Sequence, residues 1–124
     1  MLKFLIDENL RSHAIGQAIL DWQAKFGQSY PLDAIRVGQP SAPPTGTRDA
    51  HLIEFCMREN RILVSVDRRT LPTELAKRVK AGDHLPGIIL FHGAVSAGEI
   101  AELLAMTSFA SDPKEFADQM SWLP

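Results

Sequence analysis

The chain has 124 residues, of which 45% are hydrophobic and 23% charged, and its formal net charge at pH 7 is −2. This composition predicts one globular domain with a single core and excludes a second domain of ordinary size. So small a net charge gives no overall attraction to nucleic acid. We expect neither a signal peptide nor a membrane span, and therefore a cytoplasmic protein. The single cysteine, Cys56, lies at an apolar helical position, which predicts a buried packing residue.

Strands and helices are predicted to alternate along the chain. Apolar runs predict strands at residues 2–6, 34–37, 62–66 and 87–92. Alternation of this kind favours parallel strands joined by right-handed crossovers. We therefore expect an α/β fold with a mostly parallel sheet of about four strands, covered by helices on both faces.

Five helices are predicted between and after these strands. Candidate caps or first residues precede most of them, at Ser12, Thr47 or Asp49, Ser96 with Glu99, and Asp112. The first helix stops at Gly27 and the second before Asn60, whereas the third runs from Pro72 through Val79. The last helix would place Phe116 and Met120 on its apolar face. Residues 38–47, rich in proline and glycine, form a stiff surface loop.

Acidic side chains follow two of the predicted strands. Asp7 and Glu8 come directly after the first strand, and Asp67 comes directly after the third. Unpaired carboxylates are costly at the end of a buried strand, and ligands of parallel α/β sheets lie beyond the carboxyl ends of the strands. Asp49, at the start of the helix that follows the second strand, can reach the same edge. The sequence therefore predicts one acidic site at this edge.

Converging carboxylates suit a hard divalent cation such as Mg²⁺ or Mn²⁺, which prefers oxygen ligands. The usual task of such ions is phosphate chemistry, because the cation activates water and offsets charge that develops on the phosphate. Response-regulator receivers and several phosphatases also place acids at strand ends. The acids by themselves therefore leave the reaction open.

Four ordered motifs resemble the PIN-like proteins of bacterial and archaeal genomes, a toxin-like branch of the PIN nuclease superfamily. The motifs are FLIDENL at residues 4–10, TRD at 47–49, ILVSVD at 62–67 and PGIIL at 86–90. A narrower subgroup is similar in a proline-rich loop like residues 36–44, in a DRxTxP stretch like residues 67–72 and in a terminal Leu-Pro like Leu123-Pro124. The resemblance covers essentially the whole chain.

This resemblance implies a three-layer PIN-like fold whose acids bind Mg²⁺ or Mn²⁺ and hydrolyse RNA, commonly as the toxin partner of an antitoxin protein. Asp7, Asp49 and Asp67 match the positions of the catalytic, metal-binding acids. Glu8 matches the Asp-Glu-Asn signature of the PIN-like branch. In strand geometry its side chain would point away from that of Asp7, so a role as a structural anchor is an equal alternative.

One position departs from the family pattern. Many relatives carry a second acid two positions after the residue that matches Asp67, and this chain has Arg69 there. Arg69 could weaken a second metal site, or it could contact a phosphate beside a site for one metal ion. A silenced protein that binds nucleic acid or protein therefore stays open beside the active ribonuclease.

Polar neighbours of the acids are candidates for contacting the substrate, namely Asn9, Arg68, Arg69 and Thr70. The alternative for Asn9 is to cap the first helix, and Ser65 and Thr70 would either support a metal ligand or satisfy backbone groups. The four histidines lack the close spacing of a zinc motif.

Two other classes of protein compete with the nuclease. A phosphoacceptor receiver needs a lysine near the end of a later strand, and no lysine occurs between Lys80 and Lys114. A non-catalytic interaction module would use an apolar surface formed by Trp22, Phe26, Phe116 and Trp122. The candidate partners in these interpretations are RNA, an antitoxin protein and a second copy of the chain.

Overall fold

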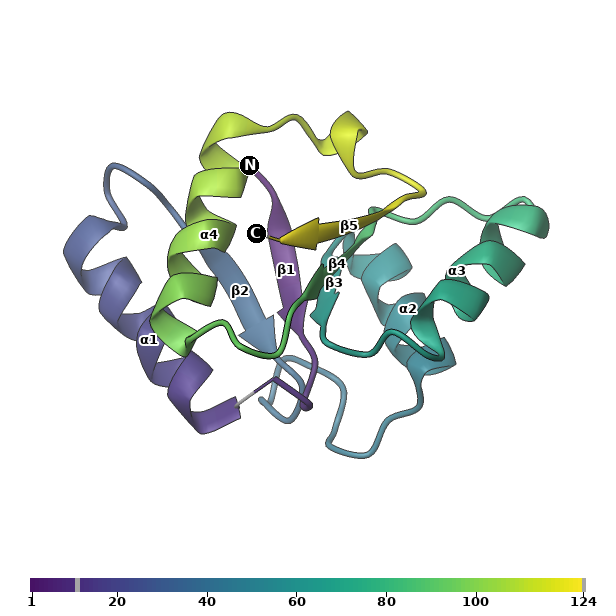
Figure 1. Cartoon of the computed structure of the whole chain (residues 1–124), viewed down its shortest axis with the longest axis horizontal. Helices are drawn as coiled ribbons and strands as arrows, with labels where there is room; N and C mark the ends of the chain where they lie inside the picture. The colour runs from purple at the N-terminus through teal and green to yellow at the C-terminus, as the bar shows by residue number, and fades with distance from the viewer. Residues whose placement is uncertain (11, 124) are drawn as a thin grey trace.

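The computed structural model describes residues 1–10 and 12–123 and arranges them in three layers (Figure 1). Within these residues, five strands form one sheet in the order β2-β1-β3-β4-β5, and every neighbouring pair is parallel. The strands are β1 (Lys3–Ile6), β2 (Asp33–Arg36), β3 (Ile62–Ser65), β4 (Ile88–Phe91) and β5 (Met120–Leu123). The predicted α/β fold with a parallel sheet between helices is confirmed, and the four predicted strands agree within one residue at each end.

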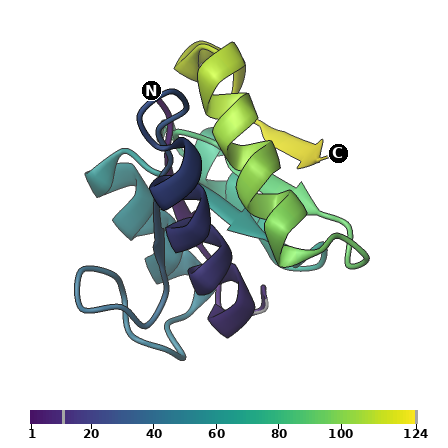
Figure 2. The same ribbon diagram turned by 90° about the vertical axis from the view of Figure 1, so that its left-hand side faces the viewer.

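Helices cover both faces of the sheet. They are α1 (Ser12–Phe26), α2 (Asp49–Glu59), α3 (Leu71–Lys80) and α4 (Ala97–Ala110), followed by a short 3₁₀ helix, η1 (Pro113–Glu115). Helices α1 and α4 pack side by side on one face, as Figure 2 shows, while α2 and α3 lie on the other (Figure 1).

The predicted caps of α2 and α4 can be compared with the structure. The Ser96 hydroxyl accepts a hydrogen bond from the Glu99 N–H at 3.2 Å, so the cap of α4 is confirmed. The prediction of Thr47 or Asp49 as the cap of α2 is wrong, because Arg48 occupies the N-cap position without a side-chain hydrogen bond. The Thr47 hydroxyl instead donates to the Pro44 carbonyl at 2.6 Å, which closes a turn in the loop.

The C-terminal segment differs most from the prediction. Asp112 caps only the single turn of η1, so the helix expected to carry Phe116 and Met120 is absent from the described residues. Asp118 then adopts a left-handed conformation with φ of 60°, and Met120 opens β5. Pairing with β4 along the whole of β5 decides this outcome, because a tertiary partner overrides weak local helix propensity.

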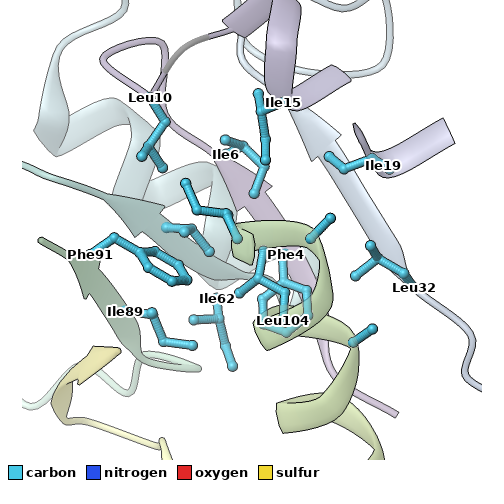
Figure 3. Close-up of a cluster of buried hydrophobic side chains, with 14 of the residues drawn as sticks. Phe4, Ile6, Leu10, Ile15, Ile19, Leu32, Ile62, Ile89, Phe91 and Leu104 are labelled. Carbon is cyan, nitrogen blue, oxygen red and sulfur yellow. The ribbon is translucent and has the colours of Figure 1, made fainter. Parts of the chain in front are cut away.

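Alternate residues of the strands fill two separate hydrophobic layers. Phe4, Ile62, Ile89 and Phe91 face α1 and α4, as Figure 3 shows for part of this cluster. Their neighbours Leu5, Leu63, Ile88 and Leu90 face α2 and α3. Burial of each such side chain contributes about 1.5–3 kcal/mol, which explains why the central strands read as continuous apolar runs.

The last crossover has the opposite hand to the others. The connections through α3 and through α4 both step in the same direction across the sheet, from β3 to β4 and from β4 to β5. Because α3 and α4 lie on opposite faces, these two connections differ in handedness. The expectation that all crossovers share one hand therefore fails at the connection from β4 to β5.

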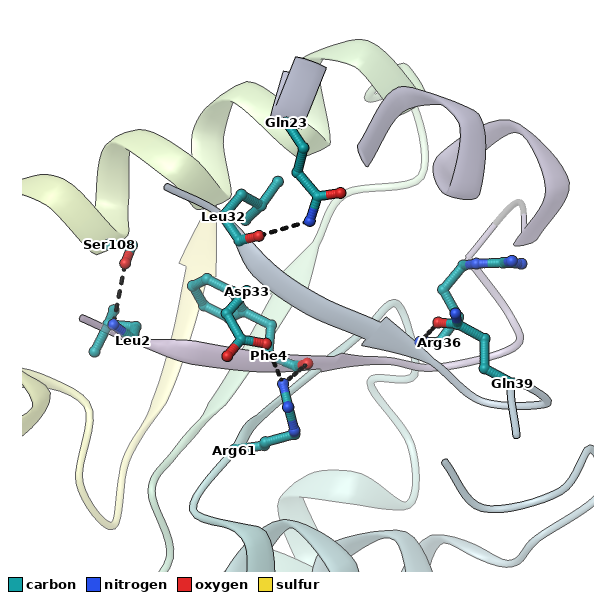
Figure 4. A network of polar contacts seen from close by, with 9 residues as sticks. All are labelled: Leu2, Phe4, Gln23, Leu32, Asp33, Arg36, Gln39, Arg61 and Ser108. Atoms are coloured by element: carbon teal, nitrogen blue, oxygen red, sulfur yellow. Dashed lines mark hydrogen bonds and ion pairs between the residues drawn. The ribbon is translucent and has the colours of Figure 1, made fainter. Parts of the chain in front are cut away.

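At the amino end of the sheet, polar groups are paired with each other (Figure 4). One guanidinium nitrogen of Arg61 donates to the Phe4 carbonyl at 3.1 Å and to the Asp33 carboxylate at 2.8 Å. The Leu2 N–H donates to the Ser108 hydroxyl of α4 at 3.0 Å.

In residues 1–10 and 12–123, no helix has both the length and the apolar character needed to cross a membrane.

Candidate functional site

Asp7 lies at the carboxyl end of β1 and is almost fully buried, with 5% of its surface exposed. Its N–H donates to the Val64 carbonyl at 2.8 Å, which extends the pairing of β1 with β3 by one residue. Its carboxylate accepts a hydrogen bond from the Ser65 hydroxyl at 2.9 Å. Burial raises the pKa of Asp7 above its ordinary value, and the negative charge of Asp49 adds to this effect.

Ser65 connects the ends of β1 and β3 and is fully buried. Besides Asp7, its hydroxyl lies 3.2 Å from the Asn9 amide oxygen and accepts from the Asp67 N–H at 3.1 Å. The Asn9 oxygen also lies 3.4 Å from the Val66 N–H. Asn9 therefore contacts β3, while its predicted role as a cap concerns the start of α1 next to residue 11, outside the described residues.

Asp67 is held by the loop that follows β3. One carboxylate oxygen accepts from the backbone N–H groups of Arg69 at 2.8 Å and Thr70 at 3.2 Å. The other oxygen lies 2.5 Å from the Thr70 hydroxyl. These hydrogen bonds, that of the Thr70 hydroxyl foremost, lower the pKa of Asp67. Asp67 is therefore the acid of this group that is held in its charged form.

Asp49 reaches the same hydroxyl from the first turn of α2. Its carboxylate also accepts a hydrogen bond from Thr70, so one threonine joins two carboxylates that are 18 residues apart in the sequence. A hydroxyl has one proton and can donate it to only one of these acceptors at a time. Burial raises the pKa of Asp49, and the nearby charge of Asp67 raises it further. Asp49 and Asp67 therefore form a mutually repelling carboxylate pair.

Glu8 is turned toward the proline-rich loop. Its carboxylate accepts a hydrogen bond from the Gly46 N–H at 2.9 Å. Gly46 has a positive φ of 88°, a backbone conformation that favours glycine. Glu8 thus makes the contact expected of a structural anchor, and its role as a metal ligand stays a prediction.

The two arginines after Asp67 differ in their surroundings. The Arg68 guanidinium carbon lies 5.3 Å from the centre of the Trp122 ring, a cation–π distance. The Arg69 backbone supports Asp67, while its side chain is exposed and makes no hydrogen bond or ion pair with the described residues. Arg69 is therefore available to an anionic ligand.

The acids fit a metal ion only in part. Within residues 1–10 and 12–123, no three His, Cys, Asp or Glu side chains are arranged to hold a metal ion. Asp49 and Asp67 converge on Thr70, while Asp7 is held by Ser65. Because Mg²⁺ commonly takes one or two carboxylates and completes its shell with water, the donor chemistry of the pair suits one such ion. Binding would require the pair to exchange the Thr70 hydroxyl for the cation.

Cys56, His84 and His92 form no hydrogen bond or ion pair with Asp7, Asp49 or Asp67 among the described residues. Cys56 is buried, as predicted, and burial raises the pKa of its thiol to about 12. His84 contacts the Asp118 carboxylate at 3.0 Å, and His92 stacks on Trp122. Phe116 is buried in the core, so of the four aromatic residues that an interaction module could use, this one packs inside the domain. Trp22 and Phe26 do lie together on α1, with ring centres 4.6 Å apart.

The fold and the site define the class of protein only broadly, as an α/β domain with a carboxylate pair and a buried aspartate at the carboxyl edge of its sheet. Comparisons with known protein families, with curated proteins and with solved structures found no match for the chain. The resemblance to PIN-like proteins therefore stays a prediction that rests on the motifs.

Proposed function

We propose that this protein is a ribonuclease that uses one Mg²⁺ or Mn²⁺ ion, bound at the carboxyl edge of the sheet, to hydrolyse phosphodiester bonds. The observation that carries the proposal is the Asp49–Thr70–Asp67 contact beside the buried Asp7. Asp49 and Asp67 share Thr70, and Asp7 ends β1 at the same edge of the sheet, the edge where ligands of α/β proteins bind.

The electrostatics support a cationic ligand. Among the described residues, no lysine, arginine or histidine forms an ion pair with Asp7, Asp49 or Asp67. The raised pKa values of Asp7 and Asp49 reflect burial and mutual repulsion without a compensating charge. A divalent cation would supply that charge, so the cost of keeping these acids together is consistent with a functional site.

The residues divide into three roles. Asp49 and Asp67 would hold the cation through the oxygens that now contact Thr70, and Asp7 would add negative charge behind them in an orientation fixed by Ser65. When bound, the cation would supply a more acidic water and offset charge on the phosphate. The Arg69 guanidinium would contact a phosphate oxygen, to which its planar fork is suited. The Asn9 amide and the Thr70 hydroxyl would contact the substrate once a cation occupies the pair.

A silenced relative that binds nucleic acid or protein is the second candidate. Two observations favour it, namely Arg69 in place of a second acid and the lack of a ready three-acid metal site among the described residues. In that case the partner would be an RNA, an antitoxin protein or a second copy of the chain. A cytoplasmic location belongs to both candidates as a prediction.

The experiment is a manganese titration of wild-type protein and of Asp67→Asn, with thermal unfolding and cleavage of a mixed-sequence single-stranded RNA measured in parallel. Asparagine keeps an acceptor for the Arg69 and Thr70 N–H groups, so the fold should persist. We expect manganese to raise the Tm of wild type, and the variant to lose this shift together with about 100-fold or more of the cleavage rate.

The matched control is Asp21→Asn, which removes an exposed acid of α1 whose carboxylate accepts only a hydrogen bond from Gln17 at 2.9 Å. This variant should behave as wild type in both measurements. Manganese-dependent stabilisation without cleavage would support the silenced relative. The absence of both effects in wild type would reject the metal site.

A further inference from the structure

Trp122 is a large aromatic side chain on the edge strand β5, and 42% of its surface is exposed. His92, directly after β4, stacks on it with ring centres 4.9 Å apart and an angle of 24° between the planes. The Arg68 guanidinium approaches the same ring at 5.3 Å. These three side chains, here called the Trp122 platform, place three planar groups together at the surface, since His92 and Arg68 are exposed as well.

The position of the platform follows from the sheet register. Trp122 pairs with Leu90, so its side chain stands on the face of the sheet that α2 and α3 cover. His92 and Arg68 both come from segments that leave the carboxyl ends of the neighbouring strands β4 and β3. The platform therefore lies at the same edge of the sheet as the acids.

The platform is joined to the acidic site through the loop after β3. Arg68 directly follows Asp67, and the Cα atoms of adjacent residues are about 3.8 Å apart. Neither Arg68 nor Arg69 forms an ion pair with a described acid, so the loop that joins the platform to Asp67 carries two arginines without a salt-bridge partner among the described residues. Positive charge beside an exposed aromatic surface is the combination that binds single-stranded nucleic acids.

We propose that the Trp122 platform is a base-stacking subsite, which binds an unpaired nucleobase of the RNA strand whose backbone lies along Arg68 and Arg69. The inference rests on the proposed function and adds to it a substrate requirement. Bases in a duplex are already stacked and paired, whereas an unpaired base offers a free face to Trp, His or Arg planes. The protein should therefore bind single strands in preference to duplexes.

Tryptophan fluorescence can report on this subsite directly. Trp22→Phe leaves Trp122 as the only tryptophan, because the chain has two. The probe is an unstructured uridine decamer, titrated in EDTA at low ionic strength so that cleavage does not enter, beside the matching duplex and a decamer that lacks its bases. We expect the uridine strand to quench Trp122, with little quenching by the duplex or the abasic strand.

Affinity measurements on Trp122 variants complete the test. Trp122→Ala should weaken binding of the uridine strand by about tenfold or more, since stacking of one base on an aromatic side chain has an effect of this order. Trp122→Phe should retain most of the affinity. The control is Phe109→Ala, which removes an aromatic side chain that is 64% exposed on α4, and it should leave binding unchanged.

Equal affinity of Trp122→Ala and wild type, or equal quenching by the abasic strand, would overturn the inference. Lack of any binding by the uridine strand would also overturn it. The proposed function fails separately, because it predicts manganese-dependent cleavage by the wild type. Quenching without cleavage would keep the subsite and reject the nuclease, and cleavage without quenching would do the reverse.

Discussion

The two ends of the sheet differ in how their charged side chains are paired. At the amino end, Arg61 bridges Asp33 and the Phe4 carbonyl. At the carboxyl end, Asp7, Asp49 and Asp67 accept hydrogen bonds from hydroxyl and backbone donors alone among the described residues, and the pKa values of Asp7 and Asp49 are raised. A fold selected for stability alone would have no reason to gather these acids. The amino end therefore contributes paired charges to stability, whereas the carboxyl end gathers the acids to which we assign the proposed site.

The largest expected effect on stability is at the amino end, in Gly87→Ala. Gly87 has φ of 130°, and an added Cβ would lie 2.4 Å from the Phe116 carbonyl oxygen, where the chain passes toward β5. Strain and overpacking together should lower the free energy of unfolding by roughly 3 kcal/mol. Urea unfolding measures this change. Gly98→Ala, on α4 with open space around it, is the control, and a similar loss in both variants would contradict the explanation.

A smaller loss is expected for Arg61→Ala, which breaks the paired network at the amino end. Only 15% of the Arg61 side chain is exposed, so its removal leaves the Phe4 carbonyl and Asp33 without this donor. We expect a loss of about 1–2 kcal/mol in the free energy of unfolding. Arg58→Ala removes an arginine that is 68% exposed and lies 3.9 Å from Glu59, and it should change stability by less than about 0.5 kcal/mol. Equal losses in the two variants would show that the paired network of Arg61 contributes no more to stability than an exposed ion pair.

At the carboxyl end we expect a substitution, Asp7→Asn, to stabilise the protein, whereas the two substitutions at the amino end destabilise it. Because the pKa of Asp7 is raised in the folded protein, the folded state holds its proton more tightly than the unfolded state. Stability from this group is therefore present below the unfolded pKa of 3.8 and is lost as pH rises through the raised folded pKa. Without metal, we expect Asp7→Asn to have a higher Tm than wild type at pH 7.

The pH dependence sharpens this smallest prediction. The advantage of Asp7→Asn over wild type should shrink as the pH falls toward 3.8, where the wild-type carboxyl also becomes neutral. Thermal unfolding from pH 3 to pH 8, with EDTA present, follows the difference. A variant less stable than wild type at pH 7 would mean that the Ser65 hydrogen bond to the charged carboxylate outweighs its burial.

Sequence reasoning located the central strands because each is a short apolar run with both faces buried. It also placed Asp7 and Asp67 on one edge, since the carboxyl ends of parallel strands lie together, whereas Asp49, at the start of α2, could only be expected to reach that edge. It missed β5, whose residues 120–123 have no strong local preference and become a strand through pairing with β4. A local pattern contains no information about a partner strand 32 residues earlier in the chain.

The finer arrangement of the site was also beyond sequence reasoning. Ser65 and Thr70 were candidates for supporting contacts, but the pairing of Thr70 with both Asp49 and Asp67 depends on how α2 and α3 pack. The contacts of Arg68 and His92 with Trp122 depend on β5. The sequence predicts a helix in place of this strand, so these contacts could not be foreseen. The sequence signal for this region was limited to Arg48 beside Asp49 and Arg68 beside Asp67.

The hydrogen bond between Ser65 and Asp7 joins residues 58 positions apart. Contacts of such long sequence separation form late in folding, because the loop between them must close first. The carboxylate group therefore depends on the pairing of β1 with β3, which closes the 58-residue separation between Asp7 and Ser65. A fragment that ends before β3 therefore lacks Ser65, Asp67 and Thr70, and with them the contacts that hold Asp7 and Asp49.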